Sequence, residues 1–498
     1  MAINKKIAVV VRQFPPFNTE TYSVSDIKAL ENMGFEVTIF SPRDAATANP
    51  QDIISDHGLN AKIITLLPSR KATPPDRTEK EHLLDTDNSA SLLEAVECYH
   101  ERPQILRILV EDNPEYKPLE QAVEFLENHG LLDKSLCLFK HDMDSLEEKP
   151  YRKKERPTKF LQSLQLAHYM CTHDIHVAYA NSFATSATLA QYATTIAGTG
   201  YVFGAQGHTN DIALLSESEV LAKLDATSFL TLSSPSALEI LQRKSPECKT
   251  PVDIVYRPVD LKAFQGDITR VTRKTTSPQH PFKIVCCGRM IEKKGQWYLL
   301  EAIAKLPPHL NLEVILFGDG PLREQLEAYA KELHIESKVH FRGHTMREEM
   351  GIEIRDSDLL VVPSIIPKNG NGEGFPTVIP EAGTTQIPVL ATDTAAAGVL
   401  THNVNAYIVP QHNSQLLAQA IESLIENPIQ REELGRNIKT FVDSTFEPSQ
   451  CRQIVRERIE QAMKAAESAR SAAVEESTSR LGIKYLIAKE QSGNRYRF

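Results

Sequence analysis

Two glutamates stand eight residues apart in the segment Glu373-Gly-Phe-Pro-Thr-Val-Ile-Pro-Glu381. The Gly-x-Pro step between them breaks a preceding strand, and Pro376 suits the first turn of a helix, where no backbone N–H is needed. Glu373 is therefore expected in the loop and Glu381 on the second turn. A helix start attracts phosphate through its unpaired N–H groups and the positive end of its dipole. Carboxylates on either side of such a start predict a nucleotide-sugar site, with sugar hydroxyls, diphosphate and ribose hydroxyls in a row.

Two basic residues, Arg289 and Lys294, flank a predicted strand-to-helix turn that Gly295 closes. Arginine presents a planar fork and lysine a compact charge, and both suit a leaving diphosphate. The alternative is a solvated basic surface, since Lys293 and Lys294 stand in a polar loop. Beside the glutamate pair, we favour phosphate binding.

Alternating strand and helix patterns predict the scaffold that positions these residues. Residues 6–11 form a continuous apolar run, as expected of a parallel strand buried on both faces. A helical pattern over 22–32 and a strand over 37–40 complete a doubly wound unit. The further expected strands are 200–204, 228–232, 252–256, 282–286, 312–317, 339–341, 359–362 and 389–391, and the expected helices of the second set are 297–306, 322–333 and 414–426.

The sequence predicts an α/β chain of two Rossmann-like domains. The N-terminal, acceptor-side domain spans 1–268 and carries a mostly helical insertion at about 66–160. A polar linker spans 269–281, and the second domain, which binds the nucleotide sugar, spans 282–445. A terminal helix over 446–476 is expected to pack back toward the N-terminal domain, and 477–498 is expected to be a tail. Ligands of such sheets bind at the carboxyl ends of the strands.

Composition excludes several classes of protein. A net charge of −10 over 498 residues argues against broad nucleic-acid binding. No run of about eighteen apolar residues predicts a membrane span, and no signal peptide is expected. The seven cysteines show no metal spacing, and Cys286 and Cys287 are expected in a core. A reduced, cytoplasmic compartment fits best. Peripheral association with the inner face of a membrane stays open, because local basic patches can meet anionic lipid.

Together, these segments resemble a retaining GT-B glycosyltransferase of family 4, of the exopolysaccharide or colanic-acid type. The C-terminal resemblance covers roughly 281–440 and adds Phe317-Gly-Asp-Gly-Pro321 and Val339-His-Phe-Arg-Gly343 to the motifs above. In the N-terminal part, the loop from Phe14 to Tyr22 is similar to Phe-Pro-x-x-Ser-Glu-Thr-Phe. The segment from Phe203 to Ile212 is similar to the family's His-x-x-Asp-Ile segment.

The resemblance implies a fold and an activity. The fold is GT-B, with two doubly wound domains facing a central cleft. The activity is transfer of a hexose from a nucleotide-diphosphate sugar to a glycan or lipid-linked saccharide acceptor in polysaccharide biosynthesis. No cofactor and no metal are expected, and Asp356-Ser-Asp358 is interpreted as structural.

The resemblance also assigns roles to single residues. Arg289 and Lys294 stabilise charge on the departing nucleoside diphosphate. Glu373 binds the donor sugar, Glu381 binds the ribose, and His208 contacts the sugar near the reacting carbon. The alternatives are a structural histidine and helix-dipole carboxylates. The other donor-site candidates are Gly288, Gly343, His344, Gly374, Phe375, Pro376 and Thr377, and the acceptor-side candidates are Glu20 and Asp211, the latter with a helix cap as its alternative.

Four positions depart from the family pattern. Gln386 replaces a glycine that closes the helix after the second glutamate, and Ala395-Ala-Ala-Gly398 replaces a Gly-Gly run followed by an acidic residue. Pro380 lies inside the proposed helix, and Arg257-Pro-Val-Asp260 replaces Asn-Gly-Val-Asp. These changes leave the phosphate site intact and the identity of the sugar undetermined.

Other functions compete with this interpretation. One is a non-catalytic GT-B subunit or glycan-binding partner. A dinucleotide-dependent oxidoreductase is disfavoured, because no Gly-x-Gly-x-x-Gly follows the first strand. A small-molecule glycosyltransferase, a phosphorylase and an epimerase remain open.

Overall fold

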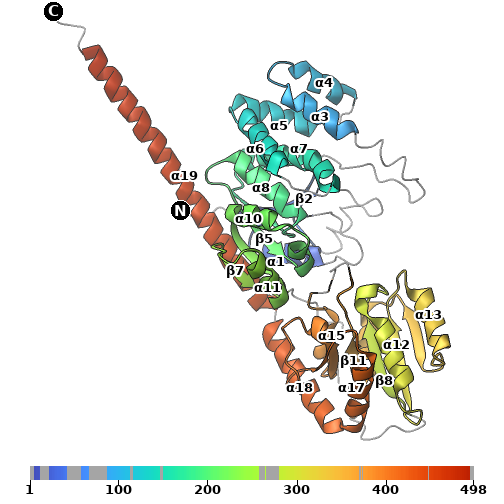
Figure 1. The fold of residues 1–498 in the computed structure, drawn as a ribbon. Coiled ribbons are helices and arrows are strands. Elements are labelled where there is room, and N and C mark those ends of the chain that lie inside the picture. Colours follow the sequence, from blue (N-terminus) through green and yellow to red (C-terminus); the bar gives the residue numbers. More distant parts are fainter. Residues whose placement is uncertain are drawn as a thin grey trace, which may run out of the picture.

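Two parallel β-sheets, each covered by helices on both faces, form the body of the computed structural model (Figure 1). The structure describes residues 5–11, 22–41, 58–66, 87–112, 116–145, 150–256, 264, 280–368, 372, 374–446 and 448–493. Most of the predicted linker, 269–279, and most of the loop 14–22 lie outside these residues. The prediction of two Rossmann-like α/β domains is confirmed.

The first sheet has seven parallel strands in the order β3-β2-β1-β4-β5-β6-β7. Its order reverses between β1 and β4, the kind of switch point beside which open α/β sheets bind ligands. The strands are β1 (Lys6–Val10), β2 (Glu36–Ser41), β3 (Lys62–Thr65), β4 (Val177–Ala180), β5 (Val202–Gly207), β6 (Thr227–Leu232) and β7 (Val252–Ile254).

Alternate residues of these strands enter two separate cores. Ala8 and Val10 of β1 belong to the core on one face of the sheet, and Ile7 and Val9 belong to the core on the opposite face. Burial on both faces is why the strand reads as an unbroken apolar run. The helices of the first core include α7 (Pro150–Thr172), α8 (Thr185–Ala197), α10 (Glu217–Ala226) and α11 (Pro235–Lys244), and α1 (Tyr22–Asn32) covers the opposite face.

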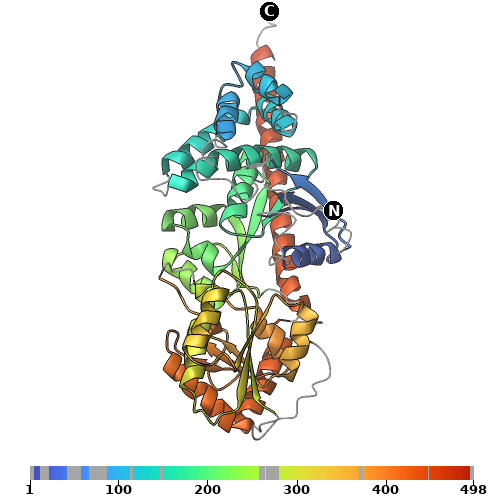
Figure 2. The same cartoon turned by 90° about the vertical axis from the view of Figure 1, so that its right-hand side faces the viewer.

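Four helices extend the first core away from the sheet (Figure 2). They belong to the segment expected as a helical insertion, and they pack through apolar residues such as Leu119, Val123 and Leu126. They are α3 (Asp87–Glu97), α4 (Pro103–Asp112), α5 (Lys117–Asn128) and α6 (Leu132–Ser145). Because they share one continuous core with the sheet, this region is part of the first domain and not a separate unit.

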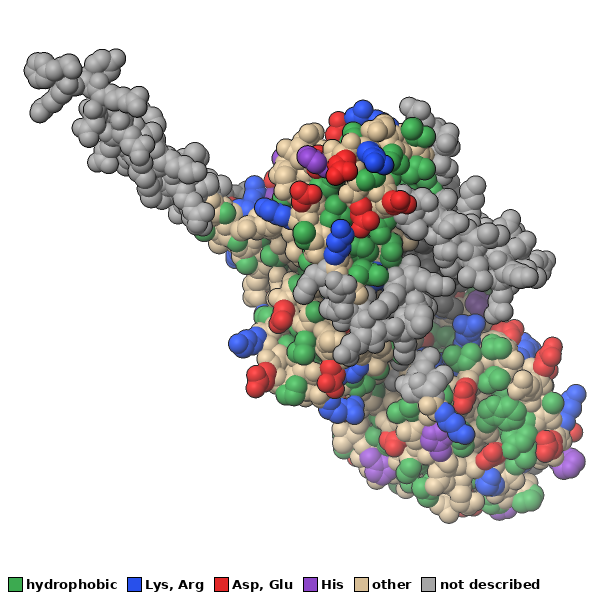
Figure 3. Space-filling view, turned by 45° about the horizontal axis from the view of Figure 1, so that its top comes forward, with side chains coloured by type: hydrophobic (Ala, Val, Ile, Leu, Met, Phe, Trp, Pro, Cys, Tyr) green, Lys and Arg blue, Asp and Glu red, His purple; other side chains and the backbone are tan. Residues whose placement is uncertain are grey.

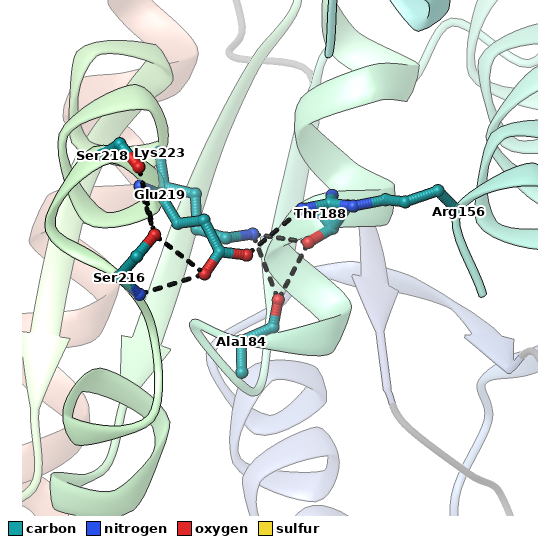
Figure 4. Close-up of polar contacts among 7 residues, drawn as sticks. All are labelled: Arg156, Ala184, Thr188, Ser216, Ser218, Glu219 and Lys223. Atoms are coloured by element: carbon teal, nitrogen blue, oxygen red, sulfur yellow. Dashed lines mark hydrogen bonds and ion pairs between the residues drawn. The ribbon is translucent and has the colours of Figure 1, made fainter. Parts of the chain in front are cut away.

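A buried ionic network joins α7, α8 and α10 (Figure 4). Arg156 of α7 donates to Glu219 of α10 at 3.3 Å, and both side chains are buried. Lys223, one turn further along α10, donates to the Ala184 carbonyl at 3.1 Å and to the hydroxyl of Thr188 on α8 at 2.5 Å. Buried charges need such partners, so the network fixes how the three helices pack.

The second sheet has six parallel strands in the order β10-β9-β8-β11-β12-β13. Neighbouring Cys286 and Cys287 face its two different cores, which confirms that both are core residues. The strands are β8 (Phe282–Cys287), β9 (Leu312–Phe317), β10 (Val339–Gly343), β11 (Leu359–Val362), β12 (Val389–Thr392) and β13 (Tyr407–Val409). The helices include α12 (Gln296–Lys305), α13 (Arg323–Glu332), α17 (Ser414–Glu426) and α18 (Pro428–Thr445).

One predicted strand is displaced. Residues 200–204 were expected to be extended, whereas β5 runs from Val202 to Gly207. Gly200 has a φ of 88°, so it belongs to the turn before the strand. Gln206 and Gly207 continue the ladder beside β6. The strand therefore ends next to His208.

The long helix α19 (Pro448–Gly493) returns to the first sheet (Figure 1). Ile459, Ala462 and Met463 complete the core on the α1 side. Arg458 binds the Asp253 carboxylate of β7 with two nitrogens, at 2.5 and 3.0 Å. The terminal helix, expected over 446–476, continues to Gly493.

We expect Arg458→Gln to lower the free energy of unfolding by about 1–3 kcal/mol, because a two-nitrogen pair between distant elements is lost. Arg456→Gln is the control: Arg456 bonds Glu460 four residues away on the same helix, a pair worth roughly 0.5 kcal/mol. Urea unfolding followed by circular dichroism measures both. Equal losses in the two variants would contradict a role for Arg458 in fixing α19.

Candidate functional site

The turn after β8 holds Lys294 across the end of that strand. Gly288 has a φ of 152°, and a Cβ there would stand 3.1 Å from Cε of Lys294. A Cβ at Gly318, after β9, would stand 2.2 Å from the Gly288 carbonyl oxygen. Glycines at these two positions let the loops after β8 and β9 stack closely and leave room for the lysine chain.

The same turn is docked on the end of β11. Gly295 has a φ of 67°, and a Cβ there would overlap the Pro363 carbonyl oxygen at 1.9 Å. The Ile365 amide donates to the Lys293 carbonyl at 2.9 Å. The position of Lys294 is therefore set by backbone contacts, while Arg289 at the start of the turn is exposed.

Glu381 lies in the first turn of α15 (Val378–Gly383), not in the second turn as the sequence predicted. The Ile379 amide donates to the Pro376 carbonyl at 3.1 Å, which closes a tight turn before the helix begins. Pro376 therefore belongs to that preceding turn. All six residues of α15 are buried, so Glu381 is held inside the domain.

Burial dominates the electrostatics of Glu381. It raises the pKa of this carboxyl group to about 7, although Arg347 and, more weakly, Lys294 act in the opposite direction. Arg347 Nη2 lies 2.8 Å from Glu381 Oε1, but its side chain is 45% exposed whereas that of Glu381 is 7% exposed. Water screens the arginine charge, so the pair offsets only part of the desolvation.

Arg347 is a site residue that the sequence reasoning missed. It begins α14 (Arg347–Asp356), and its guanidinium lies 5.5 Å from the ring centre of buried Phe264. It stands three residues beyond His344, at the end of the loop that holds the donor-site candidates Gly343 and His344. Its positive charge, so close to His344 in the sequence, was the feature that could have identified it. His344 itself is exposed, and buried Gly343 has a φ of 72° and bonds Gly318 through its carbonyl.

Phe375 packs between the two domains. Its ring stacks on Phe446 at 5.5 Å and lies 6.4 Å from Tyr256, which follows β7. The ring of Phe375 is therefore occupied by these contacts, and only its backbone N–H is suited to bind a phosphate. Pro376 is buried beside it, and Thr377 is exposed.

His208 follows β5 at the carboxyl edge of the first sheet. Its Nδ1 lies 3.0 Å from the Ser233 hydroxyl at the end of β6, and its amide donates to Asp211 Oδ2 at 3.4 Å. That second contact gives Asp211 the role of a cap at the start of α9 (Thr209–Ala213), the alternative considered for it.

The loop of His208 meets the segment before α15 of the other domain. A Cβ at Gly374 would stand 3.2 Å from the Thr209 hydroxyl oxygen. A second approach joins Gly398, after β12, to Pro235 at the start of α11, at 3.6 Å. The structure thus brings His208 near the segment that contains Gly374. Glu373 and Glu20 lie outside the described residues.

Residues at two of the departures from the family pattern adopt a left-handed backbone conformation. Gln386 has a φ of 58°, a left-handed conformation that glycine adopts without cost. Ala397 and Gly398 are also left-handed, at 49° and 69°. The chain thus keeps a glycine-like backbone after α15 with a larger residue in place.

Asp356 and Asp358 are engaged in structural contacts. Lys283 bonds Asp356 with its side chain at 2.6 Å and Asp358 with its backbone N–H at 2.9 Å, which supports their structural interpretation. Within the described ranges, no group of three or more His, Cys, Asp or Glu is arranged to hold a metal ion.

The outer surface shows no field of one sign on the face in Figure 3, where acidic and basic side chains are interspersed. Over the part of the chain that the structure describes, no helix is both long and apolar enough to span a membrane.

The chain is similar to known glycosyltransferases. Residues 267–441 match the family model of glycosyl transferases group 1. A putative colanic acid biosynthesis glycosyltransferase of Escherichia coli is 27% identical over 158 residues, covering 31% of this chain and 39% of the relative. An amylovoran biosynthesis glycosyltransferase of Erwinia amylovora is 28% identical over 140 residues, covering 28% and 34%. The chain thus spans well under two thirds of the length of these relatives.

Solved structures match over nearly the whole chain. Anabaena HepE, solved with UDP, has a TM-score of 0.59 and 17% identity, with 92% of this chain and 100% of that chain covered. The sucrose-phosphate synthase of Thermosynechococcus elongatus has a TM-score of 0.59 and 15% identity, with 93% and 100% covered. At such identities the likeness shows the fold, and the predicted GT-B fold class is confirmed.

The raised pKa of Glu381 predicts a pH-dependent difference from Glu381→Gln. Because the folded pKa, about 7, lies above the ordinary value of 4.5, the carboxyl group destabilises the protein increasingly as pH rises from 4.5 to about 7, and the effect levels off above that. Relative to wild type, the variant should gain about 2 kcal/mol between pH 5.5 and 8.5. Melting of both ligand-free proteins at pH 5.5, 6.5, 7.5 and 8.5 measures this gain, and a constant difference would contradict it.

Proposed function

We propose that the protein is a retaining glycosyltransferase that moves a hexose from a nucleotide-diphosphate sugar to a glycan or lipid-linked saccharide in polysaccharide biosynthesis. One observation carries the proposal. Lys294 and the buried Glu381 act on each other electrostatically in one domain, and the loop next to that helix start meets the His208 loop of the other domain.

In this proposal the donor lies across the end of the second sheet. Lys294 and Arg289 bind the diphosphate and stabilise the charge that develops as it leaves. Glu381 accepts hydrogen bonds from the ribose, and Glu373 accepts them from the donor sugar. Gly288 leaves room for the Lys294 side chain to reach the diphosphate, and the backbone N–H groups of Gly374, Phe375 and Thr377 bind phosphate oxygens.

The reaction is proposed to need no metal, since two cationic side chains meet the charge of the diphosphate. For retention, we propose that the acceptor attacks on the face of the departing phosphate, which takes the acceptor proton. His208 then contacts the sugar and is no general base. Its Nδ1 lies 3.0 Å from the Ser233 hydroxyl, a contact that orients the imidazole ring.

The names of the similar proteins support the class of substrate. Colanic acid and amylovoran appear in the titles of two relatives, and UDP and UDP-glucose were bound in the HepE structures. We propose action in the cytoplasm, at the membrane face where a lipid-linked acceptor is presented. A non-catalytic GT-B subunit is the second candidate, and the ordered Lys294 turn speaks against it.

A donor screen tests the proposal directly. Purified protein is incubated with UDP-, GDP- and ADP-sugars, with and without saccharide acceptors, and release of nucleoside diphosphate is read by mass spectrometry. Turnover of at least one donor with a new glycosidic bond is expected. Binding of nucleotide without any release would instead favour the non-catalytic subunit.

Lys294→Ala should lower kcat by about 100-fold or more with the fold retained, because one preorganised cation at the leaving group is lost. Lys293→Ala is the matched control, since Lys293 holds Ile365 through its backbone carbonyl. Kinetics and circular dichroism of both variants separate chemistry from folding. Near-normal turnover in Lys294→Ala would contradict the proposal that Lys294 binds the leaving diphosphate.

Glu381 must be ionised to accept two ribose hydroxyls, so donor kcat/KM should fall below pH 7. Arg347→Leu removes a charge that lowers the pKa of Glu381, and the acid limb of the profile should move to higher pH. Arg347→Lys keeps a positive charge and should move it less. Identical acid limbs in all three proteins would show that Arg347 does not act through Glu381.

A further inference from the structure

The middle of α19 is fastened at the amino ends of β4 and β5, the edge of the first sheet opposite the candidate site. Arg470 lies across the turn before β5, where a Cβ on Gly200 would stand 1.9 Å from its Cγ. It follows the residues of α19 that pack in the core on the α1 side, and the helix continues beyond it to Gly493 (Figure 1). The contacts of Arg470 therefore hold the helix just past its core-packed part.

Arg470 meets a histidine and a carboxylate of the loop before β4. Its Nη1 contacts Nε2 of His176 and lies 3.6 Å from Oδ1 of Asp174. The same carboxylate oxygen lies 2.8 Å from His176 Nε2, which can donate a hydrogen bond to it. One carboxylate thus connects the arginine of α19 and the histidine of the loop.

The charge of the His176 ring decides how favourable this arrangement is. A neutral ring can donate from Nε2 to Asp174 and leave Nδ1 without a proton. A protonated ring must also carry a proton on Nδ1, which is buried and meets no hydrogen-bond partner within the described ranges. It would also place a second positive charge in contact with Arg470. The side chain of His176 is only 12% exposed, so water screens this repulsion poorly.

The surroundings of His176 favour its neutral form. Burial is the largest cause that lowers the pKa of His176 below its ordinary value of 6.5, and Arg470 acts in the same direction. Asp174 and Glu467 act in the opposite direction and offset only part of this effect. The ring is therefore neutral at neutral pH.

The other groups that face the ring keep one charge as the pH falls from neutral to about 5. The hydrogen bond with His176 is the largest cause that lowers the pKa of Asp174, and Lys6 adds to it, so this carboxyl group stays ionised. The Tyr201 ring lies 4.9 Å from the His176 ring, and burial raises its pKa. Burial also raises the pKa of Cys171, which bonds Tyr201, so both groups stay uncharged. Protonation of His176 is thus the change in charge at this place.

We propose that His176, Asp174 and Arg470 form a proton-sensitive clasp that holds the middle of α19 on the first sheet and opens as the pH falls. The stabilisation is present in full above pH 6.5, where the released histidine is also neutral. It is lost as the pH falls below 6.5, because the released histidine then takes up a proton more readily than the docked one. The start of α19, which Arg458 binds to β7, stays in place. The clasp does not depend on the proposed transferase activity.

Hydrogen–deuterium exchange of the full chain tests the clasp. Peptides over residues 464–473 are followed by mass spectrometry at pH 7.5 and 5.5, with rates corrected for the intrinsic effect of pH. The corrected rate of wild type should rise about threefold or more at pH 5.5, because the protonated ring repels Arg470. In His176→Gln, whose side chain does not titrate, the two corrected rates should be equal. Peptides over 452–463 report on the start of the helix and should not respond to pH.

Two further variants separate the clasp from a general effect on the helix. Arg470→Leu removes the contact from the side of α19, so exchange over 464–473 should be fast at both pH values. Arg456→Gln is the matched control and should behave as wild type, since Arg456 bonds Glu460 on the same helix. Circular dichroism checks the fold of each variant at both pH values. Equal corrected rates in wild type would overturn the inference, and so would a pH effect that persists in His176→Gln.

Discussion

The arrangement of the two domains depends on an aromatic contact where the chain passes between them. Tyr256 ends the described part of the first domain, Phe446 follows the last helix of the second, and their ring centres lie 5.0 Å apart. Phe375, in the segment before α15, stacks on Phe446. Packing of large apolar rings is strong and specific in geometry. The same three rings therefore hold both the chain where it passes between the domains and the segment before Glu381. A change in the orientation of the domains would also move that segment.

The long terminal helix completes this arrangement. It starts just after Phe446, covers the face of the first sheet that α1 leaves open, and binds β7 through Arg458. Its second turn contributes Arg452 to the cavity that Gln206 lines. A helix remote in sequence thus forms one wall of a cavity next to the strand that ends at His208.

Inside the second domain, close backbone approach and burial set the chemistry. Gly288, Gly295 and Gly318 bring three strand ends together, and Lys294 extends over them. Glu381 lies so deep that its pKa rises to about 7 despite Arg347. Because this pKa lies near neutral pH, a bound ligand or a neighbouring charge can change the protonation state of Glu381. A glutamate with an ordinary pKa stays ionised at this pH.

Alternating apolar runs, two sets of strand and helix patterns, and motifs in a consistent order determined the fold class, because parallel strands buried on both faces leave a plain signal in sequence. The spacing from Glu373 to Glu381 likewise indicated a loop followed by a helix. Only the tertiary structure decided that Glu381 lies in the first turn and is buried, that Arg347 pairs with it, and that Thr209 meets Gly374. It also decided that Gln206 and Arg452 share a cavity. These are contacts between residues far apart in the chain, and they depend on how helices pack, which local periodicity does not encode.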